Sequence, residues 1–391
     1  MPLRDDYPHI SFSKSWTIVL NTAFLLGRCQ AMIDVISDTP IDPDYRQSLY
    51  LVSLRKGARA TTAIEGNTLS DEEVERIQQG EHLPLSKNYL ETEVNNILSA
   101  LVAIRNEVIL GQSDALITPE LLLSFHKMVG QNLGDNFEAI PGKFRQSGHN
   151  VVVGRYRAPD ADYISDLIQK LCVWLRREFN YETGQQTFMD KIIEAIVCHV
   201  YIAWIHPFGD GNGRTARLVE FYLLLRAGLP DLASHILSNH YNNTREAYYR
   251  HIDVATRERN LTRFIEYAVQ GFHDGLLEVL NIISANQKST IWENYIHSTM
   301  DTSKVSGKSK AVMERQRKLA LSLSTDNYFS VDDLMMSNVK VLKLYRDLSD
   351  ATIRRDLKEL MRKDIVVEQR GAYKGNIELL LHRLPPTKNH H

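Results

Sequence analysis

The apolar residues of the chain recur every three or four positions over most of its length, which predicts helices with one buried face. The first clear helix starts after Asp42, a helix-capping residue type, has Pro43 in its first turn, and ends before Gly66. Ser70 and Glu73 then form a capping-box pattern that starts the next helix. We expect further helices over residues 87–110, 118–133, 161–179, 187–205, 213–227, 244–256 and 261–300.

One stretch in the middle of the chain breaks this pattern: "GKFRQSGHNVVVGRYRAPDADY", residues 142–163. Three valines stand there between Gly148 and Gly154, which indicates a short hairpin or an extended flap. An ordinary surface loop is an equal alternative. Further along, the small polar residues of 301–310 indicate a linker, and residues 386–391 read as a polar tail.

Composition places the chain among globular proteins. Of its 391 residues 43% are apolar and 24% charged, and this length predicts two or three domains. No apolar run reaches the roughly 18 residues that cross a membrane, and the N-terminal residues lack the apolar core of a signal peptide. The cysteines, Cys29, Cys172 and Cys198, lie in helical patterns and are odd in number. These features favour reduced thiols, a cytoplasmic location and no membrane partner.

Charge is distributed unevenly along the chain. Residues from Asp301 onward carry 18 Lys and Arg against 12 Asp and Glu, whereas the first 300 residues carry 28 against 36. Such an asymmetry suggests that the two parts of the chain have different partners.

The stretch "IHPFGDGNGRTAR", which begins at Ile205, joins two strongly apolar helices and has the composition of a phosphate site. Pro207 should end the first helix, so the glycine-rich half of the stretch forms the N-terminus of the second. Free N–H groups and the helix dipole favour an anion at that position. Gly211 and Gly213 allow the backbone to approach such an anion closely.

Four polar side chains in this stretch suit the chemistry of a nucleotide. Arg214 and Arg217 lie three positions apart on the first turn of the second helix, where their guanidinium groups can grip phosphate oxygens. Asp210 is a candidate Mg²⁺ ligand, and His206 is a candidate general base. The alternative is an ordinary turn between helices, because the run lacks the lysine of a Walker loop and the spaced acids of a calcium loop.

The string "HPFGDGNGR", with Arg217 three residues on, resembles the signature H-P-F-x-[D/E]-G-N-G-R-x-x-R of the Fic family, and every specified position is filled. The resemblance extends across roughly 40–290. It implies a mainly α fold: a Fic-type helical bundle with a short β-hairpin flap at about 142–160. We expect an N-terminal helical region over 1–110, with an inhibitory helix at about 43–66, and a catalytic core over 111–300.

This resemblance implies transfer of AMP from ATP to a Ser, Thr or Tyr hydroxyl of a protein, the chain itself included, with release of pyrophosphate. It makes His206 the general base and Asp210 the ligand of Mg²⁺ or Mn²⁺, and it places Arg214 on the β-phosphate and Arg217 on the γ-phosphate. Doc-like kinases carry lysine at the position of Gly213, so glycine favours AMP transfer over phosphate transfer. The ATP-binding residues implied in this way are Gly211, Asn212, Gly213, Arg214, Thr215, Ala216, Arg217 and, with less support, Asn243.

A second motif lies in the N-terminal region, in "TTAIEGN". Glu65 occupies the last turn of a predicted helix, where a negative charge is unfavourable unless a cation pairs with it; a solvated surface position is the usual alternative. The string resembles the Fic inhibitory motif [S/T]-x-x-x-E-[G/N], filled by Thr61, Glu65 and Gly66. The resemblance implies that Glu65 pairs with Arg217 and blocks productive docking of the γ-phosphate. In some relatives the same glutamate supports removal of AMP, and this alternative stays open.

Three further predictions concern the surroundings of the site. Asn243 lies in "NHYNNTREAYYRHI", which resembles the segment that closes the nucleotide site. Tyr248 and Tyr249 are either neighbours of the adenine or, more commonly for such residues, core. His199 reads as a core histidine, and Phe208 as an apolar anchor of the loop. The flap would bind an extended segment of the target protein by strand addition.

Residues 311–385 read as three short helices and two strands, 365–367 and 377–381. The stretch "ATIRRDLKEL" looks like the recognition helix of a winged helix-turn-helix domain, with Arg354, Arg355 and Lys358 as candidate DNA contacts. Winged helices also serve as protein-interaction or dimerisation modules, so a homodimer is an alternative. A DNA-binding regulator with a nucleotide-sensing Fic site is a further alternative, although a sensor has no need of His206 as a base.

Overall fold

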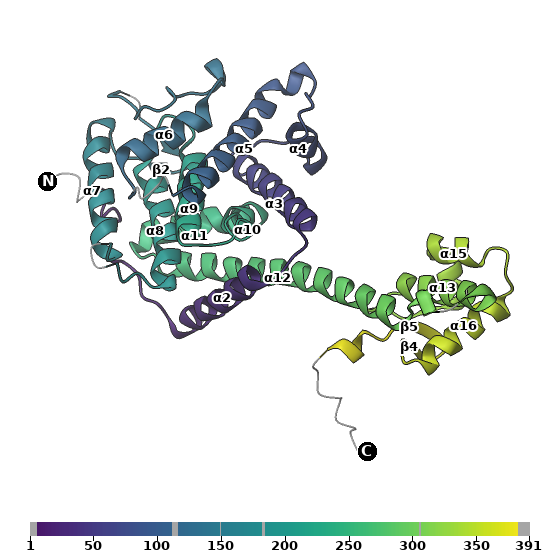
Figure 1. Cartoon of the computed structure of the whole chain (residues 1–391). Coiled ribbons are helices and arrows are strands. Elements are labelled where there is room, and N and C mark those ends of the chain that lie inside the picture. Colours follow the sequence, from purple (N-terminus) through teal and green to yellow (C-terminus); the bar gives the residue numbers. More distant parts are fainter. Residues whose placement is uncertain (1–5, 112–115, 149, 182–183, 305, 382–391) are drawn as a thin grey trace. The chain divides into compact units, whose positions relative to one another are not determined.

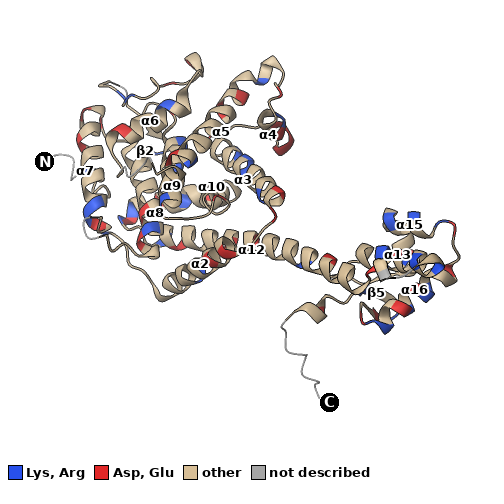
Figure 2. Ribbon diagram, in the orientation of Figure 1, with Lys and Arg blue, Asp and Glu red and all other residues tan. Residues whose placement is uncertain are grey.

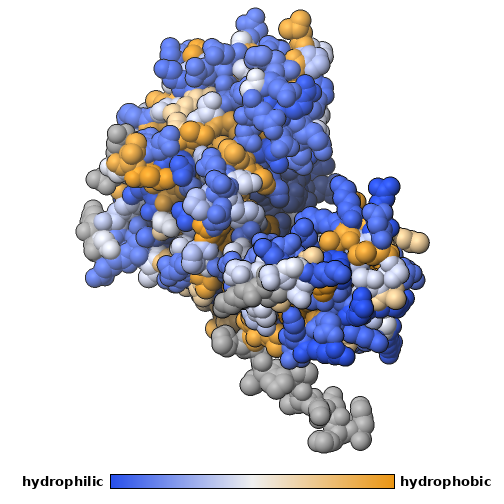
Figure 3. Space-filling view, turned by 45° about the vertical axis from the view of Figure 1, so that its right-hand side comes forward, coloured by the Kyte–Doolittle hydropathy of each residue, from blue (hydrophilic) through white to orange (hydrophobic). Residues whose placement is uncertain are grey.

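The computed structural model describes residues 6–111, 116–148, 150–181, 184–304 and 306–381. The described chain is mainly helical with two small antiparallel sheets, and the predicted fold class is confirmed. It divides into two compact units, Met1–Asn281 and Ile282–His391, and the division falls within the long helix α12 (Thr262–Thr299) (Figure 1). None of the described helices is both long and apolar enough to cross a membrane. The face shown in Figure 3 is mostly hydrophilic, with apolar residues in several separate patches.

The helices of the first unit begin and end close to where the sequence patterns place them. The Asp42 side chain accepts a hydrogen bond from the backbone N–H of Asp44, at 3.0 Å, and Ser70 and Glu73 form the predicted capping box. The helices that match predicted segments are α3 (Pro43–Ala63), α4 (Asp71–Gln78), α5 (Asn88–Ile109), α6 (Pro119–Gly130), α7 (Ile164–Glu178), α8 (Phe188–Ile205), α9 (Asn212–Arg226) and α11 (Arg245–Glu258).

Two helices of this unit were not predicted, α2 (Leu20–Asp38) and α10 (Ile236–Asn243). Neither has a side chain that caps its N-terminus, so the usual start signal is missing from the sequence. Helix α2 also exposes large apolar side chains, Leu20 and Phe24 among them, which weakens the contrast between its two faces.

Helix α8 forms the centre of the first unit, because its residues from Ile192 onward are buried on nearly every side. Thr187 caps this helix through a capping box with Asp190. Helix α9 packs along α8, and α3, α5 and α6 pack around α9. The segment that follows the glycine-rich loop is therefore enclosed by helices from the first third of the chain.

The stretch that breaks the helical pattern contains the predicted hairpin, formed by β1 (Val152–Val153) and β2 (Tyr156–Arg157). The strands are antiparallel, and Gly154, with φ of 60°, lies in the turn between them. The Tyr156 hydroxyl donates a hydrogen bond to the backbone carbonyl of Trp204 at 2.7 Å. The hairpin is thus tied to the C-terminal end of α8, next to the glycine-rich loop.

The second unit combines short helices with a three-stranded antiparallel sheet of order β3-β5-β4. On α16 the predicted apolar face, with Ile353, Leu357 and Leu360, is buried in the core of this unit. Lys and Arg residues are frequent on its helices α13, α15 and α16 (Figure 2). After residue 306 the elements are α13 (Gly307–Ser322), β3 (Phe329–Ser330), α14 (Val331–Ser337), α15 (Val339–Tyr345), α16 (Asp350–Arg362), β4 (Val366–Gln369) and β5 (Ala372–Gly375).

Two predictions for the second unit are wrong. Its described residues after 306 form four helices instead of three, and Ile377–Leu380 is a 3-10 turn instead of a strand. Arg370 and Gly371 have φ of 52° and 80°, so they make a two-residue turn directly after β4. The returning strand therefore lies at Ala372–Gly375, earlier than the apolar run that suggested it.

Candidate active site

The glycine-rich loop is held in one shape by its own backbone and by the Asn212 side chain. His206 ends α8 with φ of 52° and Gly211 precedes α9 with φ of 77°, so the chain turns through left-handed positions at both ends. The Asn212 carboxamide accepts a hydrogen bond from the N–H of Phe208 and donates one to its carbonyl, both at 2.9 Å. The Asn212 side chain is therefore engaged within the loop, and its predicted role at an anion falls to the backbone N–H.

The buried histidine His126, which was not a candidate in the sequence analysis, contacts the loop. His126 on α6 stacks on Phe208, with ring centroids 3.7 Å apart, and Phe208 is fully buried. Nδ1 of His126 accepts a hydrogen bond from the N–H of Gly142 at 3.1 Å, so its Nε2 donates to the carbonyl of Asp210 at 3.0 Å. Burial lowers the pKa of His126 to about 4, which keeps the ring neutral. The ring thus fixes the backbone of the residue proposed as a metal ligand.

The geometry of His206 suits a general base. Its Nδ1 lies 3.2 Å from the carbonyl of Ala203, an acceptor, so Nδ1 carries the proton and Nε2 keeps its lone pair. Burial lowers the pKa of His206 from its ordinary value, and the positive charge of Arg145 acts in the same direction. Arg145, also missed from the sequence, donates from Nε to the carbonyl of His206 at 2.8 Å. The imidazole is therefore held in place and neutral near pH 7.

Arg214 lies between two carboxylates and is almost fully buried. Its Nη2 contacts Asp210 Oδ1 at 2.7 Å, and its Nη1 forms an ion pair with Glu93 Oε1 on α5. Glu93 was not a candidate in the sequence analysis, because it lies far from the loop along the chain. The side chain of Asp210 keeps about 30% of its surface exposed, so its carboxylate also faces the solvent.

Arg217 is fully buried, and the structure brings it together with Glu65. Its Nη2 donates to Glu65 Oε1 at 2.6 Å and to the backbone carbonyl of Thr61 at 2.9 Å. Burial alone would raise the pKa of Glu65, but the charge and hydrogen bond of Arg217 outweigh it and hold this pKa below its ordinary value. Within the described residues, Nε and Nη1 of Arg217 have no hydrogen-bond partner.

Gly213 leaves space for the Glu65 carboxylate, in addition to its predicted contact with a phosphate. A Cβ atom at this position would lie 2.1 Å from Glu65 Oε1. Any larger residue would therefore push the Glu65 carboxylate out of its place beside Arg217. Gly66, which follows Glu65, has φ of 104° and ends the α3 segment.

The other predicted residues form no described hydrogen bond with residues 206–217. Tyr248 is buried and its hydroxyl lies 2.9 Å from Nε2 of the fully buried His199, so both are core residues. Tyr249 is 41% exposed, with its hydroxyl 3.4 Å from the carbonyl of Ile64. Asn243 ends α10 and is exposed, and none of the hydrogen bonds described for the chain joins it to the loop. Its nucleotide contact stays a prediction.

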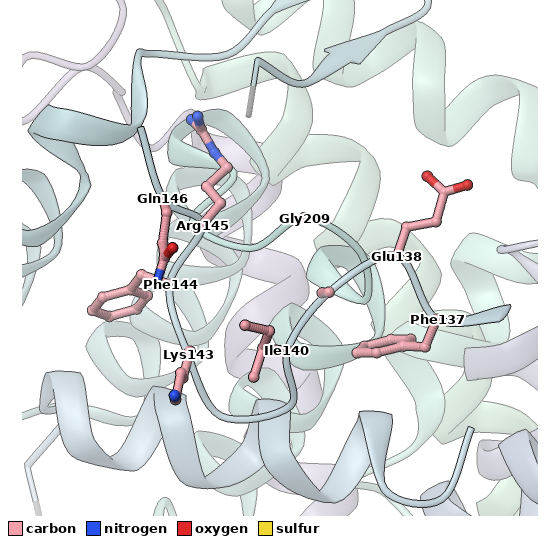
Figure 4. A pocket seen from close by; sticks show the side chains of 9 residues that line it. Phe137, Glu138, Ile140, Lys143, Phe144, Arg145, Gln146 and Gly209 are labelled. Atoms are coloured by element: carbon pink, nitrogen blue, oxygen red, sulfur yellow. The ribbon is translucent and has the colours of Figure 1, made fainter. Parts of the chain in front are cut away.

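A pocket of about 280 Å³ opens beside the loop (Figure 4). Phe137, Ile140 and Phe144 give it apolar walls, and Gly209 of the loop contributes to its lining. A Cβ atom on Gly209 would lie 2.5 Å from the carbonyl of Glu138, so glycine allows the segment before the hairpin to lie against the loop.

The donor set around the loop fits a single metal-bound polyphosphate. The described residues contain no cluster of three or more His, Cys, Asp and Glu side chains that could hold a metal ion by themselves. Mg²⁺, however, typically takes one or two carboxylates and completes its shell with phosphate oxygens and water. Asp210 supplies one carboxylate, and the unpartnered donors of Arg214 and Arg217 lie on the same helix turn as the α9 N-terminus.

Comparison with known proteins defines the class of this region. Residues 116–224 match the model of the Fic/DOC family, so this part of the chain is a Fic/DOC domain. The chain is 28% identical over 250 residues to protein adenylyltransferase fic-1 of Caenorhabditis briggsae, covering 63% of this chain and 45% of the relative. It is 32% identical over 209 residues to protein adenylyltransferase Fic of Culex quinquefasciatus, covering 53% and 38%. The chain thus spans less than half the length of these curated relatives.

Solved structures show the same fold. A Fic family protein from Desulfovibrio desulfuricans G20 superposes with a TM-score of 0.57 at 22% identity, covering 93% of this chain and 98% of that chain. Residues 134–508 of Fic-1 from C. elegans superpose with a TM-score of 0.53 at 22% identity, covering 68% and 73%. At this identity the likeness extends to the fold alone.

Proposed function

We propose that the chain is a protein adenylyltransferase, which moves AMP from ATP to a Ser, Thr or Tyr hydroxyl of a protein and releases pyrophosphate. The observation that carries the proposal is the position of a neutral His206 directly before a helix N-terminus whose first turn holds two buried arginines with unpartnered donors. The names of the similar proteins support the same activity.

The geometry of the loop supports the following reaction. His206 Nε2 accepts the proton of the acceptor hydroxyl, whose oxygen then forms a bond to the α-phosphorus of ATP. The bond between that phosphorus and the bridging oxygen to the β-phosphate breaks, and pyrophosphate leaves. Backbone N–H groups of residues 211–213 and the α9 dipole stabilise the α-phosphate, and Arg214 stabilises the leaving group. Asp210 would hold a Mg²⁺ ion, which neutralises phosphate charge when it is bound.

The acceptor polypeptide would lie between the hairpin and the loop. In the part of the chain that the structure describes, β1 pairs with β2 alone, so its other edge can pair with an extended segment. The pocket beside Gly209 would receive a neighbouring side chain of the acceptor.

We propose a cytoplasmic location, because ATP and protein acceptors are both present there. The homodimer stays a prediction.

Glu65 would act as an intramolecular brake in this enzyme. Its carboxylate occupies Nη2 of Arg217, the arginine assigned to the γ-phosphate, and so competes with that phosphate for the same donor. Removal of the side chain by Glu65→Gly should therefore raise AMP transfer strongly.

Label transfer from ATP tests the activity, the brake and the base together. Wild type, Glu65→Gly and Glu65→Gly/His206→Ala are incubated with cell lysate and with ATP labelled on the α- or the γ-phosphate. We expect protein labelling from the α-phosphate only, strong in Glu65→Gly and lost in the double variant. Labelling from the γ-phosphate would identify a kinase instead. Silence in all three proteins, with release of AMP from a pre-modified protein by wild type, would identify an AMP-removing enzyme.

A second function is proposed for the second unit, as a winged-helix module that binds double-stranded DNA. The specific observation is on α16, which buries its apolar face and exposes Arg354, Arg355 and Lys358, while Arg370 is exposed at the β4–β5 turn. A basic helix beside a basic hairpin tip suits a major groove and its flanking phosphates.

Fluorescence anisotropy with a labelled DNA duplex tests this second function on the full chain. Binding that weakens with rising salt, and weakens further in Arg354→Ala/Arg355→Ala, is the expected result. Arg257→Ala/Arg263→Ala, which removes two exposed arginines of the first unit, serves as a charge-matched control. Equal binding by the double variant and the control would show that α16 is a solvated surface or a protein-interaction face.

A further inference from the structure

Glu93 connects two parts of the molecule that the Fic motifs treat separately. It lies on α5, before residues 116–224, and its carboxylate is 7% exposed. One oxygen pairs with Nη1 of Arg214, and the other accepts a hydrogen bond from the Asn67 carboxamide at 3.0 Å. Glu93 therefore contacts both the first arginine of the loop motif and the residue that follows Gly66.

Arg214 depends on Glu93 once a metal ion binds. In the structure Arg214 has two carboxylate partners, Glu93 and Asp210. The proposed reaction takes Asp210 for the metal ion, which leaves Glu93 as the remaining carboxylate that holds the nearly buried guanidinium of Arg214 in place for the β-phosphate. A buried charge without a partner is strongly unfavourable. Without the Glu93 carboxylate, the Arg214 guanidinium would therefore move out of its position or disturb the packing around it.

Asn67 ties this pair to the segment that carries Glu65. Its carboxamide oxygen accepts a hydrogen bond from the N–H of Leu69 at 3.1 Å, and its nitrogen also donates to the carbonyl of Leu90 at 3.0 Å. The residue is buried, so these bonds have no competition from bulk solvent. A movement of the end of α3 that releases Glu65 from Arg217 would pull on Asn67 and so on Glu93.

We propose that Glu93 is the positioning residue of Arg214 and that, through Asn67, it couples the β-phosphate site to the segment that carries Glu65. The inference rests on the proposed function, which assigns Arg214 to the β-phosphate. It adds a second connection between the inhibitory helix and the nucleotide, separate from the contact of Glu65 with Arg217. Glu93 contacts no substrate atom itself, because its two oxygens are used by Arg214 and Asn67.

Calorimetric binding of two nucleotides in the presence of Mg²⁺ separates positioning from general stability. ADP has the β-phosphate that Arg214 would contact, whereas AMP lacks it, and neither has the γ-phosphate that Glu65 opposes. We expect Glu93→Gln to raise the Kd of ADP about 10-fold, which corresponds to about 1.4 kcal/mol of binding free energy. The Kd of AMP should stay within twofold of wild type. Glu93→Asp, which keeps the charge, should recover part of the loss.

Glu91→Gln is the matched control, because Glu91 is also a buried carboxylate on α5 but bonds to His82 and to the N–H of Leu83. It should change neither ADP nor AMP binding. Asn67→Ala should weaken ADP binding about threefold, and its effect should not add to that of Glu93→Gln, because both act on one chain of contacts.

Two results would overturn the inference. An equal loss of ADP and AMP binding in Glu93→Gln would make Glu93 a residue of the fold alone, and unchanged ADP binding would exclude a role in placing Arg214. If Glu65→Gly transfers AMP while either result is found, the inference fails and the proposed function stands. If wild type binds neither nucleotide, both fail.

Discussion

Two clusters of buried charge in this molecule are built in opposite ways. In the second unit, the carboxylate of Asp356 is 1% exposed and accepts four hydrogen bonds, from Nε and Nη2 of Arg315 at 2.6 and 3.2 Å and from Gln316 and Tyr345 at 2.9 Å. In the first unit, Arg217 is equally buried but uses only Nη2, and Nε and Nη1 have no partner among the described residues.

We interpret the difference as that between a cluster that serves the fold and one that would serve a ligand. A buried donor or acceptor without a partner is unfavourable by about 1–3 kcal/mol, so a chain that needed only stability would not retain several of them. Around the loop, unpartnered buried atoms gather within four residues: Nε of Arg214, Oγ1 of Thr215, and Nε and Nη1 of Arg217. A polyphosphate supplies the acceptors that these donors lack. Asp356, in contrast, leaves nothing for a ligand to complete.

Glu220 is a third case: a buried carboxylic acid group near Arg217 in which one oxygen accepts a hydrogen bond and the other has none among the described residues. Its Oε1 accepts a hydrogen bond from the Tyr241 hydroxyl at 3.0 Å, and its Oε2 has no partner among the described residues. Burial raises the pKa of Glu220 to about 8, more than Tyr241 and Arg217 lower it. The side chain is therefore neutral at pH 7, and the molecule avoids an unpaired buried charge.

The largest change in stability is expected at Asp356, whose carboxylate accepts four hydrogen bonds. Asp356→Asn removes the charge that pairs with Arg315, and we expect it to lower the free energy of unfolding by about 3 kcal/mol. Hydrogen exchange of the full chain at rising urea concentration, read on peptides from the core of this unit, measures the loss. Asp332→Asn, at an exposed position, is the control and should change stability by less than about 0.5 kcal/mol. A small loss in Asp356→Asn would remove the contrast between the two clusters.

A pH-dependent effect follows from Glu220. Between the ordinary Glu pKa and about 8 the folded state holds a proton that the unfolded state has lost, so stability should fall as pH rises through this range. The slope is at most about 1.4 kcal/mol per pH unit. In Glu220→Gln the side chain cannot ionise, so its melting temperature relative to wild type should rise from pH 5.5 to pH 8. A constant difference between the two proteins would show that Glu220 is ionised in the folded state.

A smaller change in stability is expected at Arg217, whose Nε and Nη1 have no hydrogen-bond partner among the described residues. Arg217→Met removes two unpartnered donors, and Glu65, whose side chain is 32% exposed, can turn to water. We expect the free energy of unfolding to stay within about 1 kcal/mol of wild type or to rise. In the Glu65→Gly background, the same change should lower ATP binding to the level of ADP binding in calorimetry. A loss of several kcal/mol would instead make Arg217 a structural residue like Arg315.

The smallest effect is a shift in a pH profile. Burial lowers the pKa of His206, so its imidazole should stay an effective base below the ordinary histidine pKa of 6.5. In the Glu65→Gly variant, the rate of AMP transfer should therefore fall on the acid side with a midpoint below pH 6.5. A midpoint at or above 6.5 would mean that the substrate or the Glu65→Gly change has opened the site to water.

The sequence by itself predicted most of the helices and the residues proposed for the chemistry of the loop. Capping residues such as Asp42 and Ser70 act within three positions, and the loop residues 206–217 are adjacent in the chain, so local patterns were enough to predict them. The pairing of Glu65 with Arg217 followed from the resemblance of two separate strings to Fic motifs, and the structure places those side chains in contact. Helix α2, which exposes large apolar side chains such as Leu20 and Phe24, showed too little contrast between its two faces to be predicted.

Only the tertiary structure decided which residues support that chemistry. Glu93 lies 121 positions from Arg214 and His126 lies 84 positions from Asp210, and no local pattern joins such pairs. Arg145 likewise reaches the carbonyl of His206 across 61 positions. The physical reason is that helix periods and caps depend on neighbours along the chain. The partner of a buried charge, in contrast, depends on which helices pack together.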